Sequence, residues 1–310
     1  MEILPMFSQA LKDQLKNVHA YAITPFLKED IAQLDTDGFA RNLDFLIGQG
    51  VHVLSIGGGT GEINALSADE LATLSRIGIE TAAGRALVIP TVPGNVKTAL
   101  ELLPQYEAMG AQIVLGMAPY TRNQVPDDLE GVYNHYRFIS NHTGLPLMPY
   151  NTQGWTPEFF ARLAGIERII GVKDPCLVPH NLFAAIQLLG DRFVWIGNKR
   201  HNPGVLHLRF QMGIEGFTAG IINFAPQFEL ELFRLAQSGA WDTMLGLQKR
   251  LAPIENLRTQ YGDVSLLKAG LDLVGLAGGP VRPPRVELPE EARQALSHQL
   301  VELGVELASC

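Results

Sequence analysis

A lysine at the end of a short apolar run is the residue of this chain best suited to covalent chemistry. Residues 169–172 (IIGV) are rich in β-branched side chains, which favour a buried strand, and the run ends at Lys173. Burial disfavours the ammonium form and lowers the pKa of a lysine, which leaves a neutral amine able to attack a ketone. We therefore predict that Lys173 forms a Schiff base with a 2-oxo acid. The alternative is a solvated lysine just beyond a strand.

A tyrosine ends another apolar run. Tyr150 is the last residue of a strand predicted over residues 147–150. A phenol both donates and accepts hydrogen bonds, so it can relay protons while a carbinolamine collapses to an imine. The alternative is a packed aromatic ring whose hydroxyl binds water.

A glycine-rich run, residues 57–62 (GGGTGE), follows a strand predicted over residues 52–56. Backbone N–H groups of Gly58, Gly59 and Thr60 can approach a bound anion, an arrangement suited to a carboxylate. A dinucleotide-binding fingerprint is one alternative, but it would follow the first strand and lead directly into a helix. Here four residues separate the run from the next predicted helix. A purely structural turn is the other alternative.

Apolar strands and amphipathic helices alternate along most of the chain, with about 30 residues for each pair. This pattern predicts an α/β fold, a (β/α)8 TIM barrel of eight parallel strands. A capping box at residues 67–70 (SADE) marks the start of one of the helices. The predicted strands are residues 18–23, 52–56, 86–91, 111–116, 147–150, 168–172, 193–196 and 216–219.

The alternation stops after Gly239, where three purely helical segments follow. We expect an N-terminal helix within residues 1–17, the catalytic barrel domain over 18–238 and a C-terminal helical domain over 239–310. The three C-terminal helices are predicted at residues 241–257, 265–274 and 290–303.

The chemistry of such a barrel lies on loops at the carboxyl ends of its strands. The glycine run, Tyr150 and Lys173 follow or end the second, fifth and sixth predicted strands. Thr218 lies in the eighth, and we expect it on the opposite wall of the site. Because these residues share one rim of the predicted barrel, Lys173 is not an isolated feature. The solvated-lysine alternative is thereby weakened.

Composition argues against several classes of partner. The net charge of −8 disfavours nucleic acid or an anionic membrane surface. No apolar run reaches the ~18 residues that a membrane span requires, and residues 1–7 lack the pattern of a signal peptide. The two cysteines, Cys176 and Cys310, form no disulfide framework. We expect a soluble, cytoplasmic protein.

We expect no metal ion and no separate cofactor, since the substrate itself is held as an imine on Lys173. The histidines show no spacing such as HxH or HExxH and do not pair with a cluster of cysteines or acids. Those considered are His52, His135, His142, His201 and His207.

Three motifs in order resemble the dihydrodipicolinate synthase / N-acetylneuraminate lyase family. Residues 58–62 (GGTGE) resemble its GTTGE loop, 149–151 (PYN) its YN motif and 171–174 (GVKD) its Schiff-base strand. The resemblance extends from residues 22–26 (AITPF) to 279–284 (GPVRPP). It implies a TIM barrel with a C-terminal helical domain, a small 2-oxo acid as the substrate, and a homotetramer built as a dimer of dimers.

The same resemblance implies a role for each matching residue. Lys173 is the imine-forming lysine and Tyr150 the phenol that relays protons. The backbone of Gly59 and Thr60 holds the carboxylate of the substrate.

Three positions depart from the synthase pattern. Gly59 replaces the first threonine of the loop, and Thr121 replaces a tyrosine that crosses the dimer interface. Trp155 replaces an arginine that binds the carboxylate of a second substrate. Because an arginine that forks onto a carboxylate has no conservative substitute, these departures argue against condensation of pyruvate with aspartate semialdehyde.

The GGTGE loop and residues 189–193, 223–226 and 267–270 resemble the 5-dehydro-4-deoxyglucarate dehydratase branch. That branch dehydrates and decarboxylates a sugar diacid through the same imine. It commonly has an arginine where this chain has Thr152, so the partner of the distal carboxylate is open. The alternatives are a pyruvate-dependent aldolase, a synthase, or a non-catalytic 2-oxo-acid binding protein. Candidates for the distal positive charge are Arg122 and Lys199.

Overall fold

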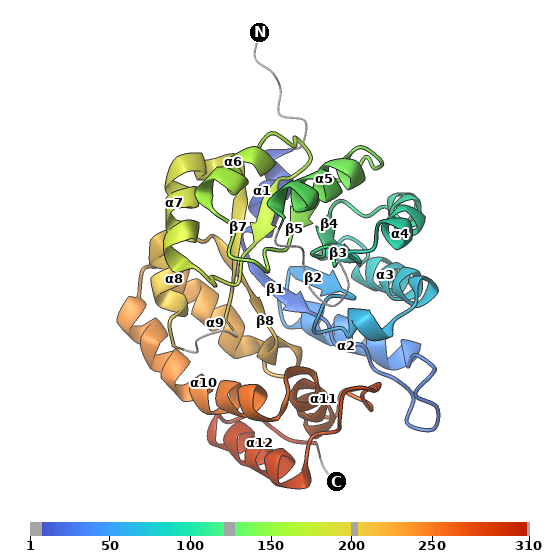
Figure 1. Cartoon of the computed structure of the whole chain (residues 1–310). Helices are drawn as coiled ribbons and strands as arrows, with labels where there is room; N and C mark the ends of the chain where they lie inside the picture. The colour runs from blue at the N-terminus through green and yellow to red at the C-terminus, as the bar shows by residue number, and fades with distance from the viewer. Residues whose placement is uncertain (1–7, 121–127, 200–203, 309–310) are drawn as a thin grey trace.

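A computed structural model of the chain describes residues 8–120, 128–199 and 204–308. Within these ranges, eight parallel strands form a barrel surrounded by helices, which confirms the predicted fold class (Figure 1). The strands are β1 (Val18–Tyr21), β2 (Val53–Ile56), β3 (Leu87–Val92), β4 (Val114–Gly116), β5 (Leu147–Pro149), β6 (Gly171–Lys173), β7 (Val194–Asn198) and β8 (Gly216–Ala219).

Helices follow the strands and cover the outside of the barrel (Figure 1). In the described part of the chain, no helix is both long and apolar enough to cross a membrane. The α-helices are α1 (Gln9–Leu15), α2 (Thr36–Gly48), α3 (Ala68–Ala82), α4 (Val96–Ala108), α5 (Leu129–Ser140), α6 (Pro157–Leu163), α7 (Pro179–Leu189), α8 (Leu206–Met212), α9 (Pro226–Gln237), α10 (Trp241–Tyr261), α11 (Asp263–Leu273) and α12 (Glu290–Glu302), and the 3-10 helices are η1 (Ile63–Ala65), η2 (Gly190–Arg192) and η3 (Ile221–Asn223).

The sheet runs in the order β5-β4-β3-β2-β1-β8-β7-β6, so β5 and β6 are its two ends. Two isolated parallel bridges join these ends, one between Leu147 and Ile169 and the other between Tyr150 and Lys173. The barrel is therefore closed at the point where the predicted catalytic phenol and amine lie.

Several strand ends differ from the prediction; β5, for example, ends at Pro149 rather than Tyr150. Three other differences concern residues that line the cavity described below. β1 ends at Tyr21 rather than Ile23, because the backbone N–H of Ile23 binds the side chain of Asn223 instead of a neighbouring strand. β7 continues to Asn198, which pairs with Thr218. β6 begins at Gly171 and includes Lys173, whereas the prediction ended it one residue earlier.

The interior of the barrel is filled from its amino-terminal end. Leu11 and Leu15 of α1 belong to the same buried cluster as interior side chains such as Ile89 and Met148. The Nε2 atom of His19 lies 2.8 Å from the backbone oxygen of Leu15, which ties α1 to β1. Because apolar side chains occupy this end, the space for a substrate lies toward the carboxyl ends of the strands.

The C-terminal helices take part in two separate hydrophobic clusters. Met244, Leu247 and Leu251 in the first half of α10 belong to the main core of the barrel. Ile254 in the second half belongs to a separate cluster with α11 and α12. Figure 1 shows these three helices stacked along one side of the barrel. The division into domains at Gly239 stays a prediction.

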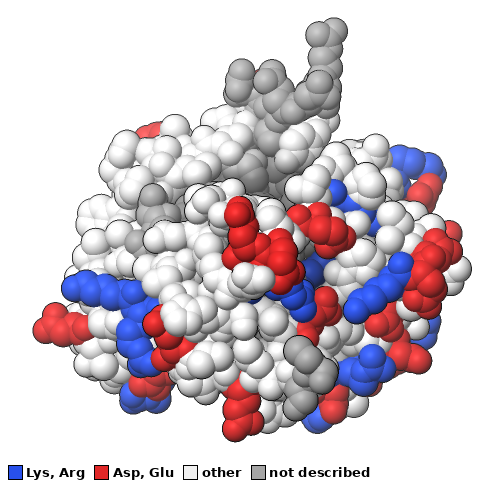
Figure 2. All heavy atoms as spheres, turned by 90° about the horizontal axis from the view of Figure 1, so that it is seen from below, with Lys and Arg blue, Asp and Glu red and all other residues white. Residues whose placement is uncertain are grey.

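The predicted capping box at the start of α3 is confirmed. The side chain of Ser67 accepts a hydrogen bond from the backbone of Glu70, whose carboxylate accepts one from the backbone N–H of Ser67. Acidic and basic side chains are interspersed on the face seen in Figure 2, so the residues described there form no broad basic area.

Candidate active site

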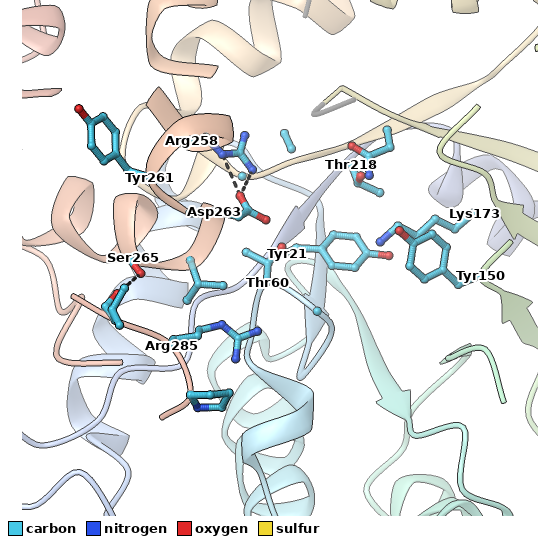
Figure 3. Close-up of a pocket in the computed structure, with 18 residues that line it drawn as sticks. Tyr21, Thr60, Tyr150, Lys173, Thr218, Arg258, Tyr261, Asp263, Ser265 and Arg285 are labelled. Carbon is cyan, nitrogen blue, oxygen red and sulfur yellow. Dashed lines mark hydrogen bonds and ion pairs between the residues drawn. The ribbon is translucent and has the colours of Figure 1, made fainter. Parts of the chain in front are cut away.

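A cavity of about 510 Å³ opens at the carboxyl-terminal rim of the barrel. Gly59, Thr60, Tyr150, Lys173 and Thr218, all predicted as site residues, line it. They come from different strands and from the loop after β2, so the barrel brings together residues that are far apart in the sequence (Figure 3).

Lys173 lies between two aromatic rings. Its Nζ is 3.9 Å from the ring centroid of Tyr21 and 4.1 Å from that of Tyr150. Only 6% of Lys173 is exposed. The amine is thus held at the buried end of the cavity, next to the phenol that the sequence predicts as its partner (Figure 3).

Tyr21 was not predicted as a site residue. It is the last residue of β1, it is 2% exposed, and its ring contacts the Lys173 amine. Burial raises the pKa of Tyr21, and the nearby Ser55 hydroxyl opposes this effect. Among the described residues, the Tyr21 hydroxyl has no hydrogen-bond partner of acceptable geometry. A buried phenol of this kind stays protonated and can donate to a substrate oxygen.

Gly58 does not line the cavity but makes room for Tyr21. A Cβ atom at this position would lie 3.0 Å from Cδ1 of the Tyr21 ring. The contact is tighter than side chains normally tolerate, so a larger residue would displace the ring that contacts Lys173. Gly58 was predicted to bind the substrate carboxylate; it is not among the described residues that line the cavity, and its role in binding stays a prediction.

Gly59 and Thr60 of the glycine run line the cavity. Among the described residues, neither backbone N–H has a hydrogen-bond acceptor. The turn is fixed by other bonds: Ile63 donates its N–H to the backbone oxygen of Gly58, and the Thr24 hydroxyl donates to that of Gly61. Two free N–H groups on a fixed turn can bind one carboxylate.

The structure argues against the dinucleotide alternative for this run. The glycines lead into the short helix η1 rather than a full helix. α3 begins only at Ala68, beyond η1, and its capping box occupies the backbone N–H groups of Ser67 and Glu70. No helix N-terminus is therefore available for a pyrophosphate at the glycine run.

Hydrogen bonds between the residues that follow Tyr150 and Lys173 hold the two strand ends together. The backbone N–H of Asn151 donates to the backbone oxygen of Lys173 at 2.9 Å. Its side-chain Nδ2 donates to Oδ2 of Asp174 at 2.7 Å, and the other Asp174 oxygen accepts from the backbone of Cys176 at 2.6 Å. Burial raises the pKa of Asp174, and the Asn151 hydrogen bond opposes the shift.

Of the two candidates for a distal positive charge, only Lys199 is described by the structure, and it does not line the cavity. Lys199 is 4% exposed and forms ion pairs with Glu229 and Glu255, away from the cavity wall. The charge of Lys199 is thus used inside the protein, and its assignment to the substrate is wrong. Arg122 lies outside the described residues, as does Thr121. Trp155 is 1% exposed and packs against other aromatic rings.

The C-terminal helices supply a wall of the cavity that the sequence did not predict. Arg258, Tyr261 and Asp263 line it from α10 and α11, and Arg285 lines it from the segment before α12. Asn198, at the end of β7, also lines it. Placing the end of that strand correctly would have revealed Asn198, but no local pattern marks the helical residues.

Known proteins resemble this chain over almost its whole length. Residues 14–303 match the profile described as the dihydrodipicolinate synthetase family. A probable 5-dehydro-4-deoxyglucarate dehydratase of Corynebacterium glutamicum is 29% identical over 306 residues, covering 96% of this chain and 94% of the relative. A 4-hydroxy-tetrahydrodipicolinate synthase of Acidothermus cellulolyticus is 32% identical over 292 residues, covering 91% and 90%.

Solved structures share the fold. The crystal structure of dihydrodipicolinate synthase from Oceanobacillus iheyensis superposes with a TM-score of 0.88 at 23% identity, covering 95% of this chain and 98% of that one. The enzyme of the same name from Thermotoga maritima gives a TM-score of 0.83 at 26% identity, covering 93% and 98%. At these identities the likeness supports the barrel and its helical extension.

The Asn151–Asp174 contact leads to a prediction about pH. In an Asn151→Asp variant, two carboxyl groups would share the place of the 2.7 Å hydrogen bond, so we expect the free energy of unfolding to fall by about 2 kcal/mol at pH 7. Repulsion raises both folded-state pKa values above the unfolded ones. Lowering the pH protonates the two carboxyl groups and restores the free energy of unfolding, whereas raising the pH ionises them and lowers it again.

Urea unfolding between pH 5 and pH 8 measures this effect. Asn151→Ala is the matched control, because it removes the same hydrogen bond without adding a carboxyl group. A stability difference between the two variants that does not change with pH would contradict the predicted proximity of the carboxyl groups.

Proposed function

The chain belongs to the dihydrodipicolinate synthetase family, a group of lyases and synthases, and we propose that it is a lyase that forms a Schiff base with its substrate. We further propose that it dehydrates and decarboxylates a 2-keto-3-deoxy sugar diacid such as 5-dehydro-4-deoxyglucarate. The observation that supports the imine most strongly is the position of the Lys173 amine between Tyr21 and Tyr150, at the buried end of the cavity.

The first step is attack of the Lys173 amine on the ketone at C2 of the substrate. The backbone N–H groups of Gly59 and Thr60 bind the adjacent carboxylate and orient the ketone. A proton then passes from the nitrogen through the Tyr150 hydroxyl to the carbinolamine oxygen, which leaves as water. Tyr21 lies on the other side of the amine and offers a second hydroxyl to the same oxygen.

The protonated imine is an electron sink for the later steps. Loss of a proton from C3 gives an enamine, which expels the hydroxyl group on C4 as water. The unsaturated imine then accepts the electron pair of the bond between C5 and C6, and the distal carboxylate leaves as carbon dioxide. The resulting dienamine takes up a proton on carbon and its C5 enol becomes an aldehyde, which restores the imine. Hydrolysis of the imine then releases 2,5-dioxopentanoate and regenerates Lys173.

One observation favours this reaction over condensation with a second carboxylated substrate. The tryptophan at position 155 is buried among aromatic rings, so it offers no charge to a second carboxylate. The named relatives include both a probable 5-dehydro-4-deoxyglucarate dehydratase and a 4-hydroxy-tetrahydrodipicolinate synthase, so their names do not separate the two reactions. The alternative of a non-catalytic binding protein fits less well, because Lys173 and Tyr150 both remain and lie together.

Incubation with a panel of 2-keto-3-deoxy sugar acids and diacids tests the reaction type. We expect one carbon dioxide and one 2,5-dioxopentanoate for each 5-dehydro-4-deoxyglucarate consumed. Release of pyruvate would instead identify an aldolase. Thermal stabilisation by pyruvate without turnover of any sugar acid would identify a binding protein.

Removal of each phenol hydroxyl tests the proton relay. Tyr150→Phe should lower kcat by about 100-fold, the contribution of a positioned acid–base group. Tyr21→Phe keeps the ring beside Lys173 and should lower kcat by about tenfold, with little change in KM, because only proton transfer is affected. Tyr106→Phe is the matched control, since its buried hydroxyl bonds the backbone of Thr91 and does not line the cavity. Unchanged kcat in Tyr150→Phe would contradict the relay.

A further inference from the structure

Two arginines line the cavity, and they differ in how their charge is used. Arg258 is 3% exposed and is paired with Glu255 at 2.6 Å and Asp263 at 2.5 Å. Its charge is balanced by these carboxylates, and the charge of Asp263 on the cavity wall is balanced in return (Figure 3). Neither member of this pair is therefore available to bind a substrate anion strongly.

The charge of Arg285 is less engaged by neighbouring residues than that of Arg258. Its guanidinium makes no hydrogen bond to any described residue, and its one ion pair is a 3.7 Å contact between Nη1 and Oε2 of Glu62. The carboxylate of Glu62 is already held by Lys268, whose Nζ lies 2.7 Å from Oε1, and by the backbone N–H of Arg282 at 3.3 Å from Oε2. Arg285 thus keeps most of its hydrogen-bonding capacity at the cavity wall.

Arg285 is positioned to contact the end of a bound substrate that lies away from Lys173. Its side chain is 29% exposed and lines the same cavity as Lys173. Figure 3 shows Lys173 with Tyr150 at one end of the cavity and Arg285 at the other side of Thr60. A substrate whose first carboxylate lies on the backbone of Gly59 and Thr60 can extend from the amine toward this open side.

We propose that Arg285 binds the distal carboxylate of a 2-oxo diacid whose keto carbon is joined to Lys173. This inference rests on the proposed function and assigns the recognition of the second carboxylate to the C-terminal helical segment. A guanidinium forks onto a carboxylate through two parallel hydrogen bonds. Apart from Lys173, the other charged residues of the described wall are Arg258 and Asp263, which pair with each other, so a second anion meets the guanidinium of Arg285.

Two 2-oxo acids of equal chain length test the binding of the distal carboxylate apart from the dehydration reaction. 2-Oxohexanedioate has a distal carboxylate, 2-oxohexanoate has a methyl group in its place, and neither carries a hydroxyl group that can leave. We expect the protein to bind the diacid about 30-fold more tightly than the monoacid in calorimetric titration. Arg285→Gln should abolish this preference while the affinities for 2-oxohexanoate and pyruvate stay the same. Arg285→Lys should restore part of it.

Arg76→Gln is the control, because it removes the same charge from an exposed helical ion pair with Glu80, and it should keep the full preference. An Arg285→Gln variant that still prefers the diacid would overturn the assignment. So would a variant that binds pyruvate and the diacid equally more weakly, since Arg285 would then serve the first carboxylate. Failure of the unaltered protein to form an imine with any of the three acids would instead defeat the proposed function itself.

Discussion

The closure of the barrel between β5 and β6 is the constraint on which the site depends. Only two isolated bridges join these strands, and the bridge nearer the rim pairs Tyr150 with Lys173. Backbone pairing therefore sets the phenol and the amine side by side before any side chain interacts. The hydrogen bond from Asn151 to Asp174 secures this junction one residue further along each strand. A site placed on rigid strand ends keeps the geometry that imine formation requires.

The barrel supplies the chemistry, whereas the C-terminal helices complete the cavity and carry its outer charges. The buried pair of Lys268 and Glu62 links α11 directly to the glycine run. Breaking such a pair leaves an uncompensated buried charge, so the glycine run and α11 are positioned together. Gly220 shows how closely the helices approach the barrel: a Cβ atom there would lie 2.5 Å from Nη2 of Arg258. Barrel and helices thus shape one site, although their sequences follow different patterns.

Most of the fold, and the two central residues, could be predicted from local patterns. A strand buried on both faces is an apolar run, and the polar residue that ends it is visible in the sequence. Tyr21 was missed because Ile23 continues the apolar run after the strand has ended, and only the contact of Ile23 with Asn223 shows where pairing stops. Arg258 and Arg285 were missed for a different reason. Their approach to Lys173 depends on how helices more than 80 residues away pack on the barrel, which no local pattern encodes.

The central claim is that Lys173 is the nucleophile, and reductive trapping tests it most directly. The protein is incubated with pyruvate and borohydride, digested, and analysed by mass spectrometry, with Lys173→Ala treated in parallel. The account predicts a mass increase equal to one reduced pyruvate adduct on the peptide that contains Lys173, and none in the variant. An adduct on another lysine, or one that persists in Lys173→Ala, would contradict it.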